Sequence, residues 1–148
     1  MRESTGTSSP HPAFLDDGGE SEVQNFLDEM AEGLTRGDAA AVAKLWEAPA
    51  FVLGDDEVHA VASQEAVRQF FAGARDQYNQ MGVTDTHAEI QMLDWLTDRI
   101  ALVEVRWPWL DGRGREIGGE TSTYVLRRDD RGNLRLRTAI MHGAEDAH

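Results

Sequence analysis

Histidine and tyrosine side chains are the groups of this sequence best suited to proton transfer and to holding a carbonyl oxygen. The unperturbed pKa of histidine lies near neutrality, so an imidazole can take up and release a proton at physiological pH. His59, His87 and His142 are therefore candidates for acid–base chemistry, and for each the alternative is a structural or exposed role. Tyr78 and Tyr124 can each donate a phenolic hydrogen bond.

The spacing of the potential metal ligands predicts no metal site. No two histidines stand at i, i+4 or H-x-H spacing, and cysteine is absent. The segment "GRGREIGG" lies between predicted strands rather than opening a helix, so it is no phosphate loop, and the chain has no nucleophile elbow. We expect neither a metal nor a cofactor.

The stretch "VRWPWLDGRG", residues 105–114, places Trp107 and Trp109 on either side of Pro108. Proline lacks the amide that a ladder needs and is tolerated where pairing ends. The two tryptophans are therefore expected where a strand leaves its sheet, each able to lay a flat surface against an apolar or ring-bearing ligand. The alternative is that they only fill the core, which is favoured more for Trp107 than for Trp109.

The elements that must position these side chains begin after a tail. Residues 1–20 are rich in Ser, Thr, Gly, Pro and Asp, and we expect them to be disordered. Ser21 and Gln24 have the spacing of a capping box at the start of a helix, and Gly37 ends it. Apolar residues form one stripe on this helix: Val23, Phe26, Leu27, Met30 and Leu34.

Two further helices enclose a hairpin. Asp38 is expected to cap the short helix "AAAVAKLW", which must finish before Pro49. The run "AFVLGDDEVHAVA" predicts a hairpin with its turn at Gly54, Asp55 and Asp56. A third helix begins after its Ser63 cap and ends at Gly82. Its apolar positions are Val67, Phe70, Phe71, Ala74 and Tyr78.

Strands dominate the rest of the chain. They are expected at about 84–96, 99–110, 118–128 and 133–143, with turns rich in Gly, Asp and Asn. Three helices followed by this meander predict one α+β domain over residues 21–143, with the helices on one face of a bent antiparallel sheet, and a C-terminal tail at 144–148.

Alternation along the strands predicts which side chains face the helices. The inward set on the second long strand is Ala101, Val103, Val105, Trp107 and Trp109, and on the last strand it is Leu134, Leu136, Thr138, Ile140 and His142. The opposite face is polar, and its opposite charges suit packing against a second copy, which predicts a homodimer. The residues expected at that interface are Glu104, Arg106, Arg135 and Arg137.

Apolar and polar residues alternate only weakly along the strand over 118–128, so the sequence does not decide which of its sides faces the helices. Tyr124 faces inward if the side it shares with Glu120, Ser122 and Leu126 does so. A bulge near Gly119 would swap the two faces.

The composition of the chain limits the kinds of partner that the protein is expected to have. The 148 residues suffice for one domain. A net charge of -13 disfavours nucleic acid as a partner, although five arginines of the last hairpin leave a binding patch as the alternative. No apolar run approaches the roughly 20 residues of a bilayer crossing, and no leader is visible at the N-terminus. We expect a soluble cytoplasmic protein, and its excess of arginine over lysine is typical of a high-GC bacterium.

The order of these elements resembles the NTF2-like superfamily, which includes ketosteroid isomerases, scytalone dehydratase and the SnoaL-like polyketide cyclases. The resemblance covers residues 21–143. It is carried by "FLDEMAEGLTRGDAAAVAKLW", "SQEAVRQFFAGA" and "GETSTYVLRRDDRGNLRLRTAIMH". It implies a cone-shaped (cystatin-like) fold with a deep pocket, frequent dimers, and functions from isomerases to plain binding domains.

The resemblance also suggests site residues. Ketosteroid isomerases carry a base shortly after the second helix, where Asp55 is the nearest carboxylate here, although a turn role is the simpler explanation of Asp55. The dehydratase branch uses histidines, which makes His59 and His142 the candidates, whereas His87 is expected to point outward. The ligand-binding candidates are Trp107, Trp109, Tyr124, Phe51 and Tyr78.

We therefore expect a small, largely apolar molecule in the pocket, with cofactor-free acid–base chemistry of the isomerase, cyclase or dehydratase type as its extension. The alternative is a non-catalytic dimerisation or ligand-carrier module.

Overall fold

A computed structural model describes residues 19–144 of the chain. The tails expected at 1–20 and 144–148 lie almost wholly outside these residues. The helices are α1 (Glu20–Arg36), α2 (Ala39–Ala43), α3 (Gln64–Phe71) and α4 (Ala74–Gln80). The strands are β1 (Trp46–Leu53), β2 (Val58–Val61), β3 (Asp85–Thr86), β4 (Glu89–Trp95), β5 (Ile100–Leu110), β6 (Glu116–Arg128) and β7 (Leu134–Ala144).

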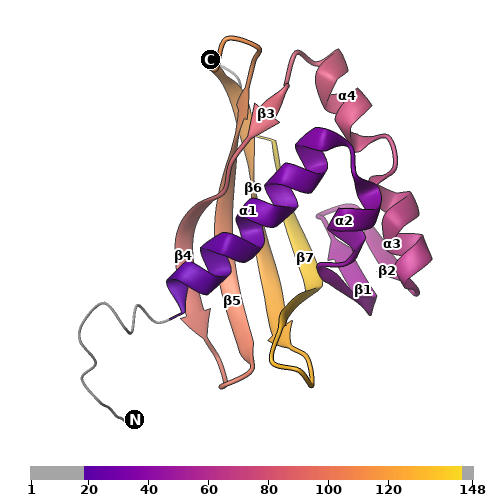
Figure 1. The fold of residues 1–148 in the computed structure, drawn as a ribbon, viewed down its shortest axis with the longest axis vertical. Helices are drawn as coiled ribbons and strands as arrows, with labels where there is room; N and C mark the ends of the chain where they lie inside the picture. Colours follow the sequence, from indigo (N-terminus) through magenta and orange to yellow (C-terminus); the bar gives the residue numbers. More distant parts are fainter. Residues whose placement is uncertain (1–18, 145–148) are drawn as a thin grey trace.

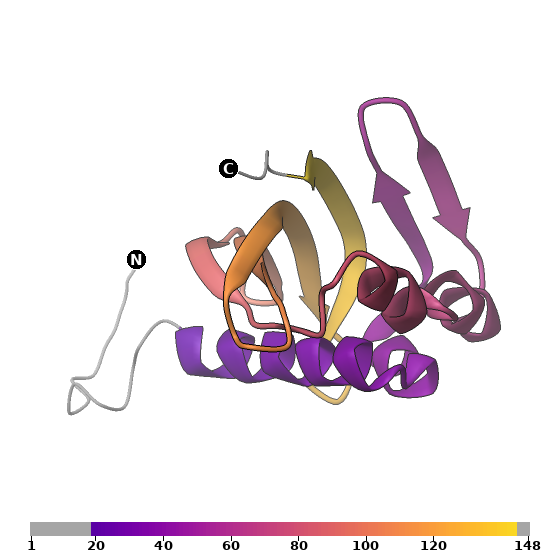
Figure 2. The same cartoon turned by 90° about the horizontal axis from the view of Figure 1, so that it is seen from above.

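The strands form one seven-stranded sheet in the order β2-β1-β7-β6-β5-β3, with β4 also paired to β5. All pairs are antiparallel except β1 with β7, which run parallel. The sheet is bent, and α1 crosses one of its faces, with α2 and α3 beside the β1–β2 hairpin and α4 above them, near β3 (Figures 1 and 2). The expected α+β fold is confirmed.

The core lies between α1 and the sheet. Val23 and Leu27 of α1 are fully buried, as the apolar stripe predicted, and they face a sheet surface that includes Val103 and Leu136. Each large aliphatic side chain buried in this way stabilises the fold by roughly 1.5–3 kcal/mol. Within residues 19–144 there is no helix with the length and apolarity to cross a membrane.

The helix ends agree with the sequence at three of four predicted caps. Gly37 ends α1 in the left-handed conformation with φ 72°, and the side chains of Asp38 and Ser63 accept hydrogen bonds from the amides of Ala41 and Ala66. The capping box at Ser21 is wrong, because the N-cap of α1 is Gly19, two residues earlier, and it makes no side-chain cap. Gln24 instead donates to Asp28 and to the carbonyl of Ala88.

Two helices are shorter than expected. The helix predicted over "AAAVAKLW" ends at Ala43, because Trp46 already pairs with Leu136 in the sheet. The single helix predicted after Ser63 is split into α3 and α4 at Gly73, whose φ of 86° is left-handed. The apolar spacing continues through this break, so periodicity alone did not reveal it.

An extra residue in β7 reverses the predicted faces of its second half. Leu136 lies opposite Leu126, but the next pair is Thr138 with Val125, which leaves Arg137 as the bulged residue. Ala139, 2% exposed, therefore faces the helices. The inward placement predicted for Thr138, Ile140 and His142 is wrong.

Candidate functional site

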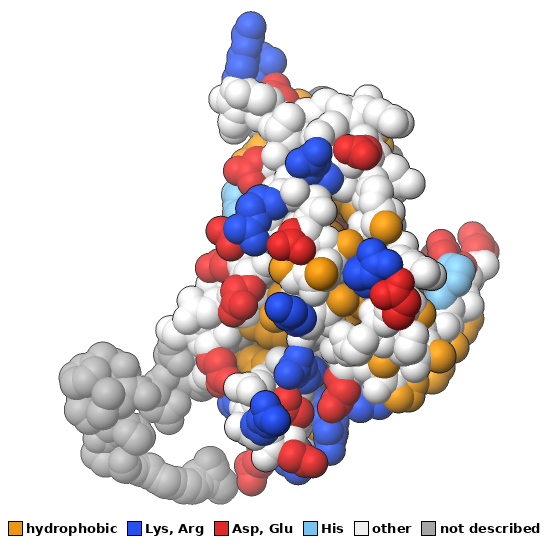
Figure 3. Space-filling view, turned by 45° about the vertical axis from the view of Figure 1, so that its right-hand side comes forward, with side chains coloured by type: hydrophobic (Ala, Val, Ile, Leu, Met, Phe, Trp, Pro, Cys, Tyr) orange, Lys and Arg blue, Asp and Glu red, His pale blue; other side chains and the backbone are white. Residues whose placement is uncertain are grey.

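A cavity of about 490 Å³ lies between the helices and the sheet at the end of the molecule that carries α3 and α4. Its wall combines side chains from α1, α3, α4 and five strands of the sheet. Apolar atoms are exposed in a strip through the middle of the corresponding face, between acidic and basic side chains (Figure 3). The predicted pocket is thus present, and it is formed where α1 and α4 stand away from the bent sheet.

Aromatic rings form much of the cavity wall. The ring centroids of Tyr78 and Trp109 are 6.2 Å apart, and those of Trp46 and Phe71 are 5.4 Å apart. Trp107 lines the same cavity and is 4% exposed. Both tryptophans of "WPW" therefore belong to the wall, and their contact with a ligand stays a prediction.

The sequence suggested that the chain leaves the sheet at Pro108, and this prediction is wrong. β5 continues to Leu110, and Pro108 still lies opposite Gly119 of β6. The Pro108 carbonyl accepts a hydrogen bond from Thr86 Oγ1 at 2.7 Å, on the side where β4 gives way to β3. Proline has no amide hydrogen, and the backbone nitrogen of Pro108 faces this break between β4 and β3. No hydrogen bond of the sheet is therefore lost at Pro108.

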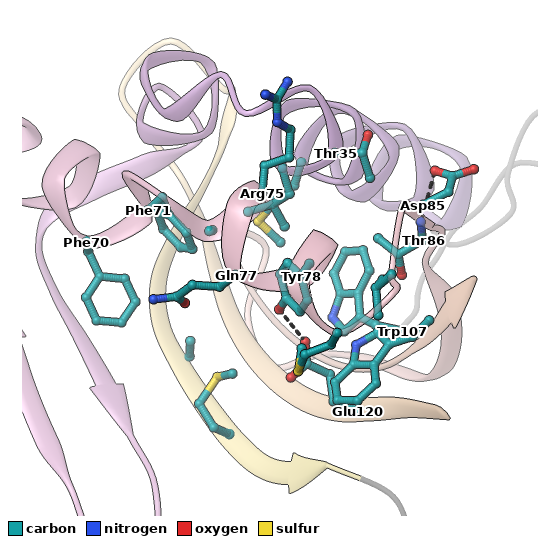
Figure 4. A pocket seen from close by; sticks show the side chains of 18 of the residues that line it. Thr35, Phe70, Phe71, Arg75, Gln77, Tyr78, Asp85, Thr86, Trp107 and Glu120 are labelled. Carbon is teal, nitrogen blue, oxygen red and sulfur yellow. Dashed lines mark hydrogen bonds between the residues drawn. The ribbon is translucent and has the colours of Figure 1, made fainter. Parts of the chain in front are cut away.

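Tyr78 of α4 and Glu120 of β6 meet across the cavity. The Tyr78 hydroxyl donates to Glu120 Oε1 at 2.9 Å, and the two side chains point toward one another (Figure 4). Burial raises the pKa of Tyr78, and the negative charge of Glu120 raises it further, so the phenol stays protonated. The result is a carboxylate held by a neutral donor in a mostly aromatic wall.

Tyr124 lies next to this pair on the inward face of β6. It is 6% exposed, and its hydroxyl oxygen accepts a hydrogen bond from Trp107 Nε1 at 2.9 Å. Burial raises the pKa of Tyr124 to about 12, so this phenol is also neutral at physiological pH. Two neutral phenols and the carboxylate of Glu120 therefore lie together in the cavity wall.

The open question of the β6 faces is settled in favour of the Tyr124 side. Ser122 and Leu126 are buried with Tyr124, and Glu120 reaches the cavity. The irregularity in the β5–β6 pairing lies before Gly118, so it does not disturb the alternation from Glu120 onward. The sequence left the direction of Glu120 open together with that of Tyr124, and the structure places Glu120 at the cavity.

Four of the predicted site residues do not line the cavity. Asp55 lies in the exposed hairpin turn, and Phe51 is 44% exposed because its neighbour Val52 takes the inward position. His59 is exposed and bonded to Glu57 at 2.7 Å. His142 lies on the outer face, with Nε2 2.7 Å from Thr123 Oγ1, because of the bulge in β7.

His87 is exposed beside Glu89, as its predicted outward direction requires. Among residues 19–144, no three His, Cys, Asp or Glu side chains form a cluster that could hold a metal ion.

The sequence matches the family described as NTF2-like protein (DUF6841) over residues 20–144. A comparison with curated protein sequences finds no match.

Solved structures with the same fold match at low identity. A cystatin-like domain of unknown function from Nostoc punctiforme has a TM-score of 0.65 and 14% identity, covering 85% of this chain and 77% of its own. An NTF-2 like protein of unknown function from Shewanella oneidensis has a TM-score of 0.64 and 12% identity, covering 84% and 98%. A ketosteroid isomerase-like protein from Erwinia carotovora atroseptica has a TM-score of 0.62 and 12% identity, covering 85% and 96%. At these identities the likeness shows the fold alone.

Proposed function

The chain belongs to an NTF2-like family, and from that premise we propose that its cavity binds a small, mostly apolar organic molecule. One observation carries the proposal: a cavity of about 490 Å³ walled by aromatic rings and holding one polar cluster. Small-molecule sites commonly measure roughly 300–1,000 Å³ and combine an apolar lining with a few convergent polar groups.

The Tyr78–Glu120 pair favours cofactor-free acid–base chemistry as a second function of the same cavity. A carboxylate in an apolar site can take a proton from carbon beside a carbonyl, while a neutral phenol donates to the oxygen that gains negative charge. Glu120 would be the base, with Tyr78 holding it, and Tyr124 a donor. The reaction would be an isomerisation, cyclisation or dehydration.

The alternatives of a ligand carrier and a dimerisation module share this fold. A carrier would bind its ligand without converting it. The expected homodimer stays part of the proposal, with the outer sheet face around Glu104, Arg106, Arg135 and Arg137 as its interface. Its support is that Glu104 makes no ion pair among residues 19–144, whereas the three arginines pair with carboxylates of their own chain.

Native mass spectrometry of freshly purified protein tests the binding proposal. We expect a retained molecule, which the variant Met141→Trp should lose because residue 141 lines the cavity. Met92→Trp is the matched control, since Met92 is a similarly exposed methionine on the outer face of β4. Equal retention by both variants would place the molecule elsewhere, and no retained molecule together with no saturable binding of apolar probes would contradict the proposal.

The retained molecule then serves as the substrate for testing catalysis. At a saturating concentration of the molecule, the variant Glu120→Gln should convert it at least about a hundredfold more slowly, as loss of a general base does. Binding without conversion by the wild-type protein would support the carrier instead.

A further inference from the structure

Two partly buried carboxylates, Glu120 in the cavity wall and Glu104 on the outer sheet face, have no cationic partner among residues 19–144. Glu47 pairs with Arg137 at 2.8 Å, Asp129 with Arg135 at 3.1 Å and Glu89 with Arg106 at 3.2 Å. Among residues 19–144, the carboxylate of Glu120 has one hydrogen bond, which Oε1 accepts from the neutral hydroxyl of Tyr78. Its second oxygen is left without a hydrogen bond from these residues.

The Glu120 carboxylate is partly shielded from water, and its only hydrogen bond from residues 19–144 comes from a neutral group. Removing an ionised carboxylate from solvent is costly unless it is paired or fully hydrogen-bonded. One phenolic hydrogen bond compensates only part of that cost, because a carboxylate can accept about four. The site therefore favours a ligand that brings a positive charge and N–H donors.

The rings around Glu120 favour the same kind of ligand. The ring of Tyr78, which holds Glu120, lies beside Trp109, and Trp107 lines the same wall. The faces of aromatic rings attract cations, by roughly 0.5–2 kcal/mol for each well-placed contact. An ammonium group near Glu120 would meet both the carboxylate and these rings.

The remaining charges around the cavity are also mostly acidic. Glu57 and Asp85 line it, and the single basic residue of the lining, Arg75, directs its guanidinium to the carbonyl of Arg36 at 3.3 Å and lies 3.9 Å from Asp76. The chain as a whole carries a formal charge of -13. Such a field raises the local concentration of cations and lowers that of anions.

We propose that the ligand is an organic cation, with an apolar, ring-bearing body against the tryptophans and a protonated amino group at the free oxygen of Glu120. This inference names the ligand class and rests on the proposed binding function. It excludes a carboxylic acid or a phosphate ester as the preferred ligand.

Three probes of similar shape and different charge test the inference by isothermal titration calorimetry on the full chain. They are 2-(2-naphthyl)ethylamine, 2-(2-naphthyl)ethanol and 2-naphthylacetate, which are cationic, neutral and anionic at neutral pH. We expect the amine to bind about tenfold more tightly than the alcohol, and the acetate to bind most weakly. Added salt should weaken the binding of the amine more than that of the alcohol.

Two variants test whether the charge of Glu120 causes the preference for the amine. Glu120→Gln should remove the preference for the amine while keeping the affinity for the alcohol within about twofold. Glu29→Gln, which removes one exposed negative charge from α1, should leave the preference intact. Circular dichroism of both variants checks that they are folded.

The outcomes separate this inference from the binding proposal. Equal affinity for the three probes, tighter binding of the acetate, or a preference that survives Glu120→Gln would overturn the cationic ligand and leave small-molecule binding standing. If none of the three probes binds up to millimolar concentration, both proposals fail together.

Discussion

The two tyrosines of the chain are both part of the cavity wall, so tyrosine ionisation reports on the site directly. Burial raises the pKa of Tyr124 to about 12 and that of Tyr78 as well. In the unfolded chain both would ionise near pH 10. We expect the folded protein to show almost no tyrosinate absorbance at about pH 10.5, and the full signal to develop only when it unfolds.

The same shift predicts how stability depends on pH. The pKa of each tyrosine is higher in the folded state than in the unfolded state, so the folded state binds the phenolic proton more firmly. The resulting contribution to the free energy of unfolding is fully present below about pH 10. It is lost as pH rises through the folded pKa of Tyr124, about 12. Tyr78→Phe leaves Tyr124 as the only reporter, and a normal titration near pH 10 in this folded variant would contradict the buried placement.

The hydrogen bond between Trp107 and Tyr124 should be measurable as a coupling. Tyr124→Phe leaves the buried Nε1 of Trp107 without its acceptor, which costs about 1–3 kcal/mol of unfolding free energy. Trp107→Phe removes the donor together with buried ring volume. In chemical denaturation the double variant should lose less stability than the sum of the two single variants, and strict additivity would show that the bond contributes nothing.

Sequence reasoning at this scale succeeded where a side chain follows a regular alternation. Trp107 and Trp109 were placed on the inward face because β5 keeps its phase through the cavity, whereas the direction of Tyr124 stayed open because β6 alternates weakly. His142 was misplaced because one extra residue in β7 reverses the phase, and nothing in the residue types around Arg137 announces a bulge. The Tyr78–Glu120 contact joins residues 42 positions apart, which a local pattern does not encode.

At the scale of elements, the contact between α1 and α2 depends on Gly33. A Cβ at this position would lie 2.8 Å from Cγ2 of Val42, a buried and stiff side chain. We expect Gly33→Ala to destabilise the protein by about 1–3 kcal/mol, because the two helices must move apart. Chemical denaturation measures the loss.

Gly112→Ala is the matched control for Gly33→Ala. A Cβ at Gly112 would meet nothing within 4 Å. The unfolding free energy of this variant should therefore change by less than about 0.5 kcal/mol. A harmless Gly33→Ala variant would mean that α1 and α2 pack less closely than described.

The extents of the elements could be predicted only where a local signal ends them. Gly37, Asp38 and Ser63 act through φ angles or side-chain hydrogen bonds that their residue types announce. The early end of α2 arises from pairing between Trp46 and Leu136, 90 residues apart in sequence, and tertiary contacts of this kind override local propensity.

At the scale of the whole molecule, the proposed dimer predicts a solution mass near twice the 16.4 kDa of one chain. Analytical ultracentrifugation measures this mass. Glu104→Arg would put a second positive charge beside Arg106 in the proposed interface. We expect the repulsion between the two copies to shift the population to single chains. Glu29→Arg, the same change of charge on exposed α1, should leave the dimer intact.

A single-chain mass for the wild-type protein would contradict the dimer without affecting the cavity.

The fold itself was predictable at this scale, because the order of helices and strands is encoded in periodicity along the whole chain. The cavity was predictable only as a consequence of that fold. Its volume depends on how far α4 stands from β6, which no local pattern specifies.

The wall formed by α4 is attached to the rest of the protein by few interactions. Its most buried side chain, Tyr78, is only partly buried, and positive-φ glycines, Gly73 and Gly82, stand on either side of the helix. Opening it would break mainly the contacts of Tyr78 with Glu120 and Trp109, so α4 is expected to unfold locally more readily than α1. Hydrogen–deuterium exchange should therefore be faster in α4 than in α1, and an occupant held at Glu120 should slow it there first.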